Sequence, residues 1–232
     1  MKNKFISGII TAAGNSSRMG TDKIFLQLGA KPAIYYTLVA FEKAQTIDEV
    51  VVVCKSEHQE ELQNLIKENN IKKVYRITKG AATRQGSVFS GVKACSSKTT
   101  HFVIHDAARC LITPEEIDNV IFDAMTHKAC TLGVPCKDTI KVINGEGFVV
   151  NTPVRSTLWA IQTPQVFEKE LYLKAMNSAL LSHKDYTDDC QLVENISEQV
   201  YVVRGNYSNL KLTTPDDVAI FENSLKIRTE KQ

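Results

Sequence analysis

The chain has 232 residues, of which 43% are hydrophobic and 23% charged, and its formal net charge is +2. This length suits one well-buried domain, and the composition is typical of a globular protein that stays in solution. The nearly neutral charge gives no general indication of a nucleic-acid or membrane partner, so an anion site has to be built from a local cluster of cations.

The first apolar run, residues 5–13, follows two lysines and is similar to the start of a signal peptide. It is too short to span a membrane and meets Gly14 and a polar loop, so we interpret it as a buried first strand. Six scattered cysteines form no CxxC pair. This pattern argues against a zinc site and favours a reducing compartment, so we expect a cytoplasmic protein.

Short apolar runs then alternate with longer amphipathic stretches. We predict buried strands at residues 6–11, 50–54, 73–77, 102–105, 130–135 and 199–203. We predict helices at residues 56–68, 83–94, 114–126, 168–181 and 188–193, and from Pro215 onward. The alternation predicts a single three-layer α/β domain, residues 1–232, around a mostly parallel sheet.

Residues 138–155 interrupt this alternation. Two β-rich runs flank Asn144-Gly145-Glu146-Gly147, a sequence that predicts a hairpin turn. Because an isolated hairpin is only marginally stable in water, we expect a β-arm that packs on a second copy of the chain and forms a homodimer. The alternative is an antiparallel edge added to the main sheet.

The loop after the first predicted strand is a candidate phosphate-binding site. It reads Ala12-Ala13-Gly14-Asn15-Ser16-Ser17-Arg18-Met19-Gly20 and continues to Lys23. Small residues let backbone N–H groups approach a phosphate, and ligands of open α/β sheets bind beyond the carboxyl ends of the strands. The loop matches neither a Walker A loop nor a dinucleotide-binding fingerprint, and the alternative is an ordinary loop with solvated charges.

With this loop, five further segments resemble one family in order and spacing. They are residues 83–88, 105–109, 155–165, 187–189 and 209–217. The whole set resembles the 2-C-methyl-D-erythritol 4-phosphate cytidylyltransferase (IspD) family, over about residues 9–225. The resemblance implies a Rossmann-like nucleotidyltransferase fold, a homodimer with exchanged β-arms, and the use of CTP and Mg²⁺ or another divalent cation.

The resemblance also assigns roles to individual residues. Arg18 and Lys23 match residues that stabilise the transition state, whereas Arg155 and Lys211 match residues that hold the incoming phosphate. The positions implied for contact with the methylerythritol phosphate are Asp106, Thr163 and Thr187. The positions implied for the nucleotide are Ala12, Ala13, Gly14, Ala81, Ser87 and Ala107. No residue is assigned as a direct metal ligand, and Asp106 is a candidate to hold magnesium through water.

The implied reaction needs positioning and positive charge rather than a covalent enzyme intermediate. A phosphate oxygen attacks the α-phosphorus of CTP, and pyrophosphate leaves. Because this nucleophile is already anionic, we interpret His105 as a packing residue and not as a general base. Arg84 is either a brace at a helix start or a triphosphate contact, and Ser87 either caps that helix or meets the base.

Three positions depart from the family's usual pattern. Lys23 follows Arg18 by only five residues, Cys110 stands in place of a proline, and Val154 in place of an aspartate. None of these changes removes a proposed catalytic cation.

Four alternatives remain open at this point. Ribitol-5-phosphate cytidylyltransferases share the fold and the nucleotide chemistry. Molybdopterin nucleotidyltransferases share the first loop, although the arm and Arg155 argue against them. A regulatory module that has lost its chemistry would bind CTP without releasing pyrophosphate, and a purely structural α/β protein would not be stabilised by CTP at all.

Overall fold

A computed structural model of the chain describes residues 4–14, 24–214 and 216–229. Its main sheet has the strand order β11-β7-β10-β6-β1-β4-β5. Only β10 among these strands is antiparallel to its neighbours, β6 and β7. The strands are β1 (Ile6–Ala12), β4 (Glu49–Cys54), β5 (Val74–Lys79), β6 (His101–Asp106), β7 (Ala129–Pro135), β10 (Trp159–Glu168) and β11 (Tyr201–Arg204), with a separate short pair, β2 (Gln27–Leu28) and β3 (Lys31–Pro32).

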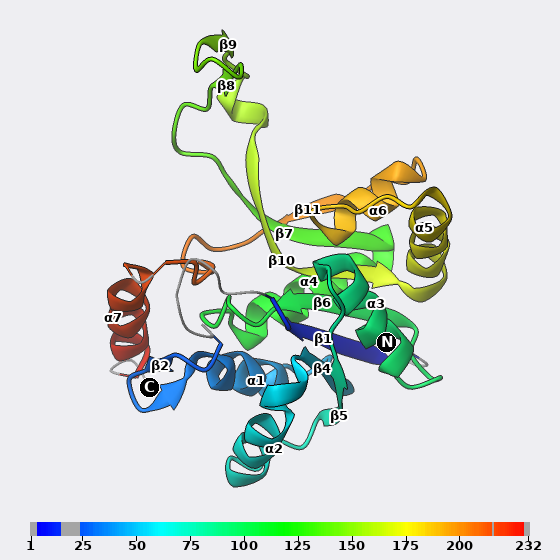
Figure 1. Cartoon of the computed structure of the whole chain (residues 1–232), viewed down its shortest axis with the longest axis vertical. Coiled ribbons are helices and arrows are strands. Elements are labelled where there is room, and N and C mark those ends of the chain that lie inside the picture. Colours follow the sequence, from blue (N-terminus) through cyan, green and yellow to red (C-terminus); the bar gives the residue numbers. More distant parts are fainter. Residues whose placement is uncertain (1–3, 15–23, 215, 230–232) are drawn as a thin grey trace.

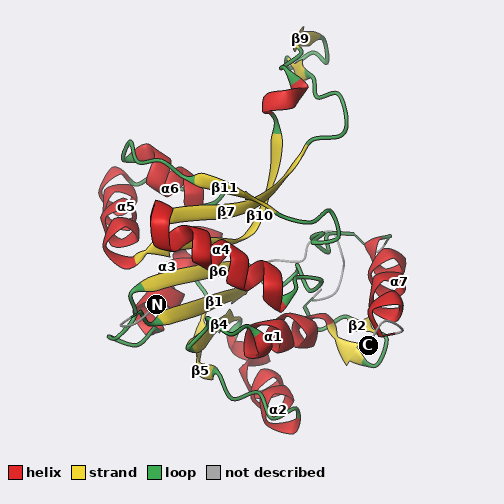
Figure 2. Ribbon diagram, turned by 180° about the vertical axis from the view of Figure 1, so that it is seen from behind, coloured by secondary structure: helices red, strands yellow, loops and turns green. Residues whose placement is uncertain are grey.

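Helices cover both faces of this sheet (Figures 1 and 2). They are α1 (Ala33–Lys43), α2 (Gln59–Glu68), α3 (Arg84–Ala94), α4 (Pro114–His127), α5 (Lys169–Ser182), α6 (Asp189–Asn195) and α7 (Asp217–Thr229). Within the described residues, no helix combines the length and apolar character needed to cross a lipid bilayer.

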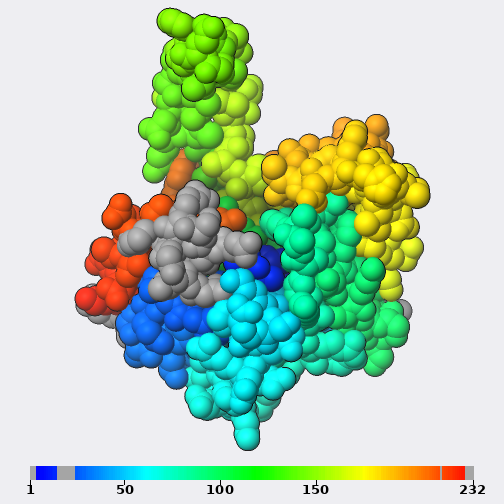
Figure 3. All heavy atoms as spheres, viewed as in Figure 1, coloured from blue at the N-terminus to red at the C-terminus, as the bar shows by residue number. Residues whose placement is uncertain are grey.

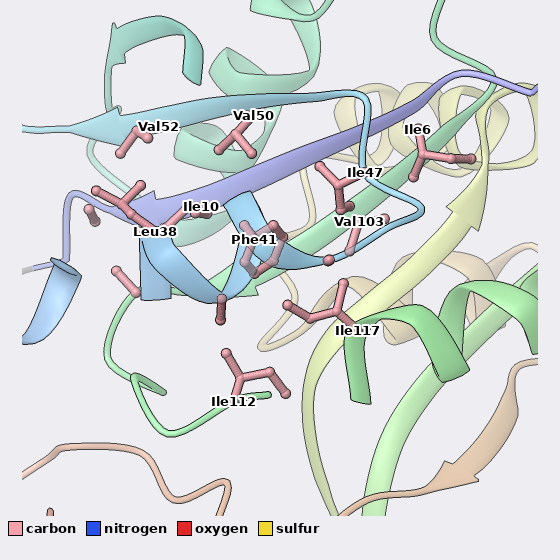
Figure 4. Close-up of a cluster of buried hydrophobic side chains, with 14 of the residues drawn as sticks. Ile6, Ile10, Leu38, Phe41, Ile47, Val50, Val52, Val103, Ile112 and Ile117 are labelled. Atoms are coloured by element: carbon pink, nitrogen blue, oxygen red, sulfur yellow. The ribbon is translucent and has the colours of Figure 1, made fainter. Parts of the chain in front are cut away.

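Alternate side chains of the central strands pack on opposite helix layers. In β1, Ile6 and Ile10 join a cluster with residues of α1 and α4, including Phe41, as Figure 4 shows. Ile9, between them in the chain, joins the other cluster with residues of α3 and α5. Because both faces are covered, every residue of β4 and β6 is buried. The predicted three-layer fold with a mostly parallel sheet is confirmed.

Most predicted elements are present, with shifts of one to three residues at their ends. The predicted helix at residues 56–68 starts with a single 3-10 turn, Ser56–His58, before α2. Helix α4 has a full capping box, in which Thr113 Oγ1 accepts a hydrogen bond from Glu116 N and the Glu116 carboxylate accepts one from Thr113 N.

Helix α1, strand β10 and the short pair of β2 and β3 were not predicted. Helix α1 buries Ile34, Leu38 and Phe41 at helical spacing, so its signal was present in the sequence. Strand β10 lacks the usual alternation because Gln162, Thr163 and Gln165 are buried polar residues, and its register shifts between Ile161 and Gln165. Such a strand can be recognised only in the folded structure, where its buried polar side chains form hydrogen bonds with other segments.

The predicted hairpin forms between β8 (Val142–Ile143) and β9 (Val149–Asn151). These strands pair with each other and not with the main sheet, so the alternative of an added antiparallel edge is wrong. Residues 136–158, here called the arm, extend from the ends of β7 and β10 and project away from the sheet (Figures 1 and 2).

Candidate active site

A pocket of about 870 Å³ opens at the carboxyl ends of β1, β4, β5 and β6. Figure 3 shows this side of the molecule, with dark blue atoms of the N-terminal segment visible between the cyan and green parts. In open α/β sheets this edge is where ligands bind. The predicted site residues that line the pocket are Ala12, Ala13, Gly14, Ala81, Ser87, Asp106 and Lys211.

The described wall of the pocket has more basic than acidic side chains. Its acidic residues are Glu57 and Asp106, whereas its basic residues are Lys55, Lys79, Arg84 and Lys211. A local cluster of cations, as the nearly neutral composition requires, is therefore present at one sheet edge. Such a cluster attracts a phosphorylated ligand.

Asp106, the last residue of β6, lies between two of these cations. Its Oδ2 accepts a hydrogen bond from Lys211 Nζ at 2.7 Å, and its Oδ1 lies 3.4 Å from Arg84 Nε. Burial alone would raise the pKa of the Asp106 carboxyl, but the charges of Arg84 and Lys211 hold it well below its usual range. Asp106 is therefore a fixed negative charge within a positive surrounding.

Two small-residue segments meet at the rim of the pocket. Ser87 Oγ donates to Thr83 O at 2.9 Å and accepts from Ala81 N at 3.0 Å, so it ties the loop before α3 to the helix. The cap of α3 is Thr83, whose hydroxyl accepts from Gly86 N. Gly80 comes so close to Ala13 that a Cβ on it would lie 2.3 Å from the Cβ of Ala13.

That close approach leads to a prediction. In Gly80→Ala, the added methyl group has to separate the loop from β1, and overpacking of this kind costs about 1–3 kcal/mol. We expect CTP to bind at least about tenfold more weakly, as measured by titration calorimetry. Gly145→Ala is the matched control because a Cβ there meets nothing within 4 Å. Equal CTP affinity in both variants would show that the contact with Ala13 does not shape the site.

His105 lies beneath the pocket and is fully buried. Its Nδ1 is 3.0 Å from Thr163 Oγ1, and its Nε2 is 3.4 Å from the carbonyl oxygen of Arg109. Burial lowers the pKa of His105 to about 3, so the ring is neutral at physiological pH. Its position agrees with the packing role that we inferred.

The lowered pKa of His105 predicts a pH-dependent stability. The unfolded chain binds a proton below about pH 6.5 whereas the folded chain does not, so the free energy of unfolding falls as the pH decreases. Between about pH 6.5 and 4.5, we expect the wild type to lose about 2 kcal/mol more than His105→Gln. Urea unfolding of both proteins measures this difference, and parallel pH curves would contradict it.

Three other predicted site residues do not line this pocket. Thr163 is buried and accepts a hydrogen bond from Asp106 N at 3.1 Å, so it contacts the site from below. Ala107 is also buried, and its N–H and carbonyl oxygen bond to Thr11 and Thr37. Thr187 lines a different hollow, of about 290 Å³, where its hydroxyl donates to Gln191.

The other predicted cations are Arg155, Arg18 and Lys23. Arg155 lies on the arm, where it is exposed, and Nη1 donates to the carbonyl oxygen of Lys137 at 3.2 Å. Arg18 and Lys23 lie outside the described residues. Their catalytic roles stay predictions.

A second pocket, of about 430 Å³, adjoins the first at the root of the arm, and Lys211 lines both. Arg109 and Lys137 also line it. Nη1 of Arg109 donates to the Asn209 carbonyl oxygen at 2.8 Å, whereas its Nε is buried without a hydrogen-bond partner among the described residues. The three basic side chains, Arg109, Lys137 and Lys211, favour an anionic ligand in this pocket.

Sequence reasoning missed several residues of the two pockets, namely Lys55, Lys79, Gly80 and Arg109. Lys55 and Lys79 lie at the carboxyl ends of predicted strands, and parallel strands place these ends at one edge. Their position after an apolar run was therefore a usable signal. Arg109 belongs to the segment at residues 105–109 that we singled out, but no role was assigned to it.

At the carboxyl ends of β1, β4, β5 and β6, the mostly parallel sheet ends in small residues. These residues line a basic pocket of suitable size for a nucleotide. These features define an α/β nucleotide-binding protein of the nucleotidyltransferase kind. The sequence matches the 2-C-methyl-D-erythritol 4-phosphate cytidylyltransferase (IspD) family over residues 6–226, and the chain belongs to this family.

Individual relatives agree with this match. The chain is 42% identical to the 2-C-methyl-D-erythritol 4-phosphate cytidylyltransferase of Caldanaerobacter subterraneus, covering 95% of this chain and 99% of the relative. It is 39% identical to that of Alkaliphilus oremlandii, with 97% and 96% covered. The crystal structure of 4-diphosphocytidyl-2C-methyl-D-erythritol synthase from Anaerococcus prevotii has a TM-score of 0.88 at 31% identity, with 97% of this chain and 100% of that chain covered.

These findings confirm the predicted family, the fold class and the enzyme class, a cytidylyltransferase. Among the alternatives, they favour a methylerythritol phosphate cytidylyltransferase over a ribitol-5-phosphate cytidylyltransferase and over a molybdopterin nucleotidyltransferase.

Proposed function

We propose that this chain transfers CMP from CTP to 2-C-methyl-D-erythritol 4-phosphate. The products are pyrophosphate and 4-diphosphocytidyl-2-C-methyl-D-erythritol, an intermediate of the non-mevalonate route to isoprenoid precursors. The observation that supports this most directly is the meeting of the small-residue end of β1 with Asp106 and Lys211 at one edge of the sheet.

The nucleotide occupies the first pocket. The Ala12–Gly14 backbone and the loop at Ala81 form a narrow slot in which only small side chains leave room for a ligand. Basic side chains at the rim balance the charge of the triphosphate. The loop with Arg18 and Lys23 follows Gly14 directly in the chain and brings two more cations to the same ligand.

The polyol phosphate occupies the second pocket, with its anionic group between Arg109 and Lys211. Two observations support this placement: Lys211 lines both pockets, and Arg109 and Lys137 add positive charge to the second one. A phosphate held there lies beside the nucleotide, so the reaction gains from proximity. Asp106 accepts hydrogen bonds from a substrate hydroxyl in this arrangement.

In the chemical step, a phosphate oxygen of the polyol forms a bond to the α-phosphorus of CTP, and the bond to pyrophosphate breaks. No proton has to be removed from an anionic phosphate, which agrees with a neutral, buried His105. Fixed cations around the α-phosphate stabilise the negative charge that accumulates in the transition state.

We assign Mg²⁺, or another divalent cation, as the cofactor. No group of three or more His, Cys, Asp or Glu side chains that could hold a metal is found within the described ranges. The residues fit an ion that binds mainly to triphosphate oxygens and meets the protein at Asp106 through water, as magnesium often does. The bound ion would neutralise part of the triphosphate charge and favour departure of pyrophosphate.

The arm forms a homodimer in this proposal. Several of its apolar side chains are strongly exposed, namely Ile143 (60%), Phe148 (68%), Val149 (59%), Val150 (65%) and Val154 (68%). A patch of this kind on a projecting hairpin is a typical contact surface between protein copies. Arg155 at its base does not line the pocket of its own chain, so it is available to the site of the partner.

The cysteines support a cytoplasmic location. Cys54, Cys110, Cys130 and Cys190 are buried. Burial raises the pKa of Cys130 and of Cys95 to about 12, which leaves both thiols unreactive. Buried, unreactive thiols of this kind are typical of a reducing compartment.

The proposed function is tested by incubating the purified protein with CTP, Mg²⁺ and either methylerythritol 4-phosphate or ribitol 5-phosphate. We expect rapid pyrophosphate release with the first polyol only. Equal or faster release with ribitol 5-phosphate would reassign the substrate. CTP binding without any pyrophosphate release would instead identify a regulatory module.

A further inference from the structure

Arg84 connects the first pocket to a buried acidic residue that lies outside it. The guanidinium Nη1 donates to Asp189 Oδ2 at 2.7 Å, and Nε lies 3.4 Å from Asp106 Oδ1. The side chain of Asp189 is 1% exposed and that of Asp106 is 10% exposed. One cation therefore bridges two carboxylates that water barely reaches.

Asp189 is itself fixed by neighbours from β10 and α5. Its Oδ1 accepts a hydrogen bond from Tyr172 Oη at 2.6 Å, and its backbone N–H donates to Gln165 Oε1 at 3.0 Å. With Arg84 on Oδ2, both carboxylate oxygens of Asp189 are in use. The guanidinium is consequently held in one orientation by a rigid partner, and the planar fork of arginine suits this bridging position.

The same end of α3 holds the chain segment before α6. Gln85 Nε2 donates to the Lys184 carbonyl oxygen, and Gln85 Oε1 accepts from Tyr186 N, both at 3.0 Å. Arg84 and Gln85 thus attach residues 184–189 to the helix whose first turn faces the pocket. This segment includes Thr187, one of the predicted substrate contacts.

The arrangement has a consequence for Lys211, which is the second cation on Asp106. If Asp106 had Lys211 as its only cationic partner, the attraction between them would compete with a substrate phosphate for the ammonium group. With Arg84 fixed beside the other carboxylate oxygen, Asp106 keeps one cationic partner when Lys211 turns toward a phosphate. Lys211 can then contact an incoming phosphate without leaving a buried carboxylate unpaired.

We infer that Arg84 and Asp189 are positioning residues, which fix the Asp106 carboxylate and keep Lys211 available for the phosphate of the polyol. This inference rests on the proposed function, in which Asp106 and Lys211 contact that substrate. It also assigns Arg84 to protein carboxylates rather than to the triphosphate of CTP.

The test compares Arg84→Gln and Asp189→Asn with the wild type in steady-state kinetics. In both variants, we expect KM for the polyol phosphate to rise about tenfold, while KM for CTP changes less than about twofold. Tyr172→Phe, which keeps both charges and loosens only the support of Asp189, is expected to raise the same KM by a smaller factor. Asp185→Asn is the matched control because its carboxylate belongs to the same segment but lies beside Thr83 instead of Arg84.

The results separate three roles. A selective rise in KM for the polyol phosphate supports positioning. Lower melting temperatures with both KM values unchanged would show that Arg84 only stabilises the fold. A larger rise in KM for CTP than for the polyol phosphate would identify Arg84 as a triphosphate contact. Either result overturns the inference. A crystal structure of Arg84→Gln decides the matter even if the wild type proves inactive, because an Asp106 carboxylate in its original place would refute positioning and a displaced one would support it.

Discussion

Replacing Lys23 or Arg18 by alanine is expected to lower kcat about 10²–10³-fold, because each change removes one fixed cation from the transition state at the α-phosphorus, worth about 3–4 kcal/mol. Both residues lie in the loop that follows Gly14, outside the described residues. The measurement is pyrophosphate release at saturating CTP and polyol phosphate. The melting temperature should stay close to that of the wild type, because arginine and lysine side chains rarely contribute to a buried core.

Lys174→Ala is the control for a general loss of positive charge. Lys174 is 65% exposed and pairs with Glu198 on the surface, at 3.5 Å. Such a pair contributes about 0–1 kcal/mol to stability, so both turnover and melting temperature should be preserved. A kcat near the wild-type value in Lys23→Ala or Arg18→Ala would remove that residue from the catalytic set.

Arg155→Ala is expected to abolish most activity with methylerythritol phosphate while CTP binding persists, because Arg155 is proposed to hold the incoming phosphate in the partner's site. Mixing Arg155→Ala chains with Lys23→Ala chains provides the sharper experiment. In a mixed dimer, one site obtains Lys23 from one chain and Arg155 from the other. With random exchange of subunits, about one quarter of the wild-type sites should become active.

The reciprocal mixture is the control. When a wild-type chain pairs with a chain of the double variant Lys23→Ala/Arg155→Ala, the mixed dimer has no complete site if the site is shared. Activity should then fall to about one quarter of the wild-type value, compared with about one half if each chain has its own complete site. Exchange of subunits is verified first with differently tagged chains. No recovery in the first mixture despite exchange would refute the shared site.

The sequence by itself determined the layers of the fold and most of its elements. Apolar runs such as β4 and the helical spacing of buried residues in α4 are local signals, and their alternation is sufficient to predict a parallel sheet covered on both faces. Candidate phosphate-binding residues were also visible, as small residues and cations directly after apolar runs. The predicted layers and elements were confirmed because each depends on neighbours within a few positions of the chain.

Only the tertiary structure decided which groups meet. The contacts of Asp106 with Lys211 and of Arg84 with Asp189 each join residues 105 positions apart, and no periodicity specifies such pairs. The insertion of β10 between β6 and β7 depends on buried polar side chains that find partners in distant segments, such as Gln165 with Asp188. The physical reason is the same in both cases: a buried charge or amide is stable only with its partner in place, and the partner comes from the fold rather than from the adjacent sequence.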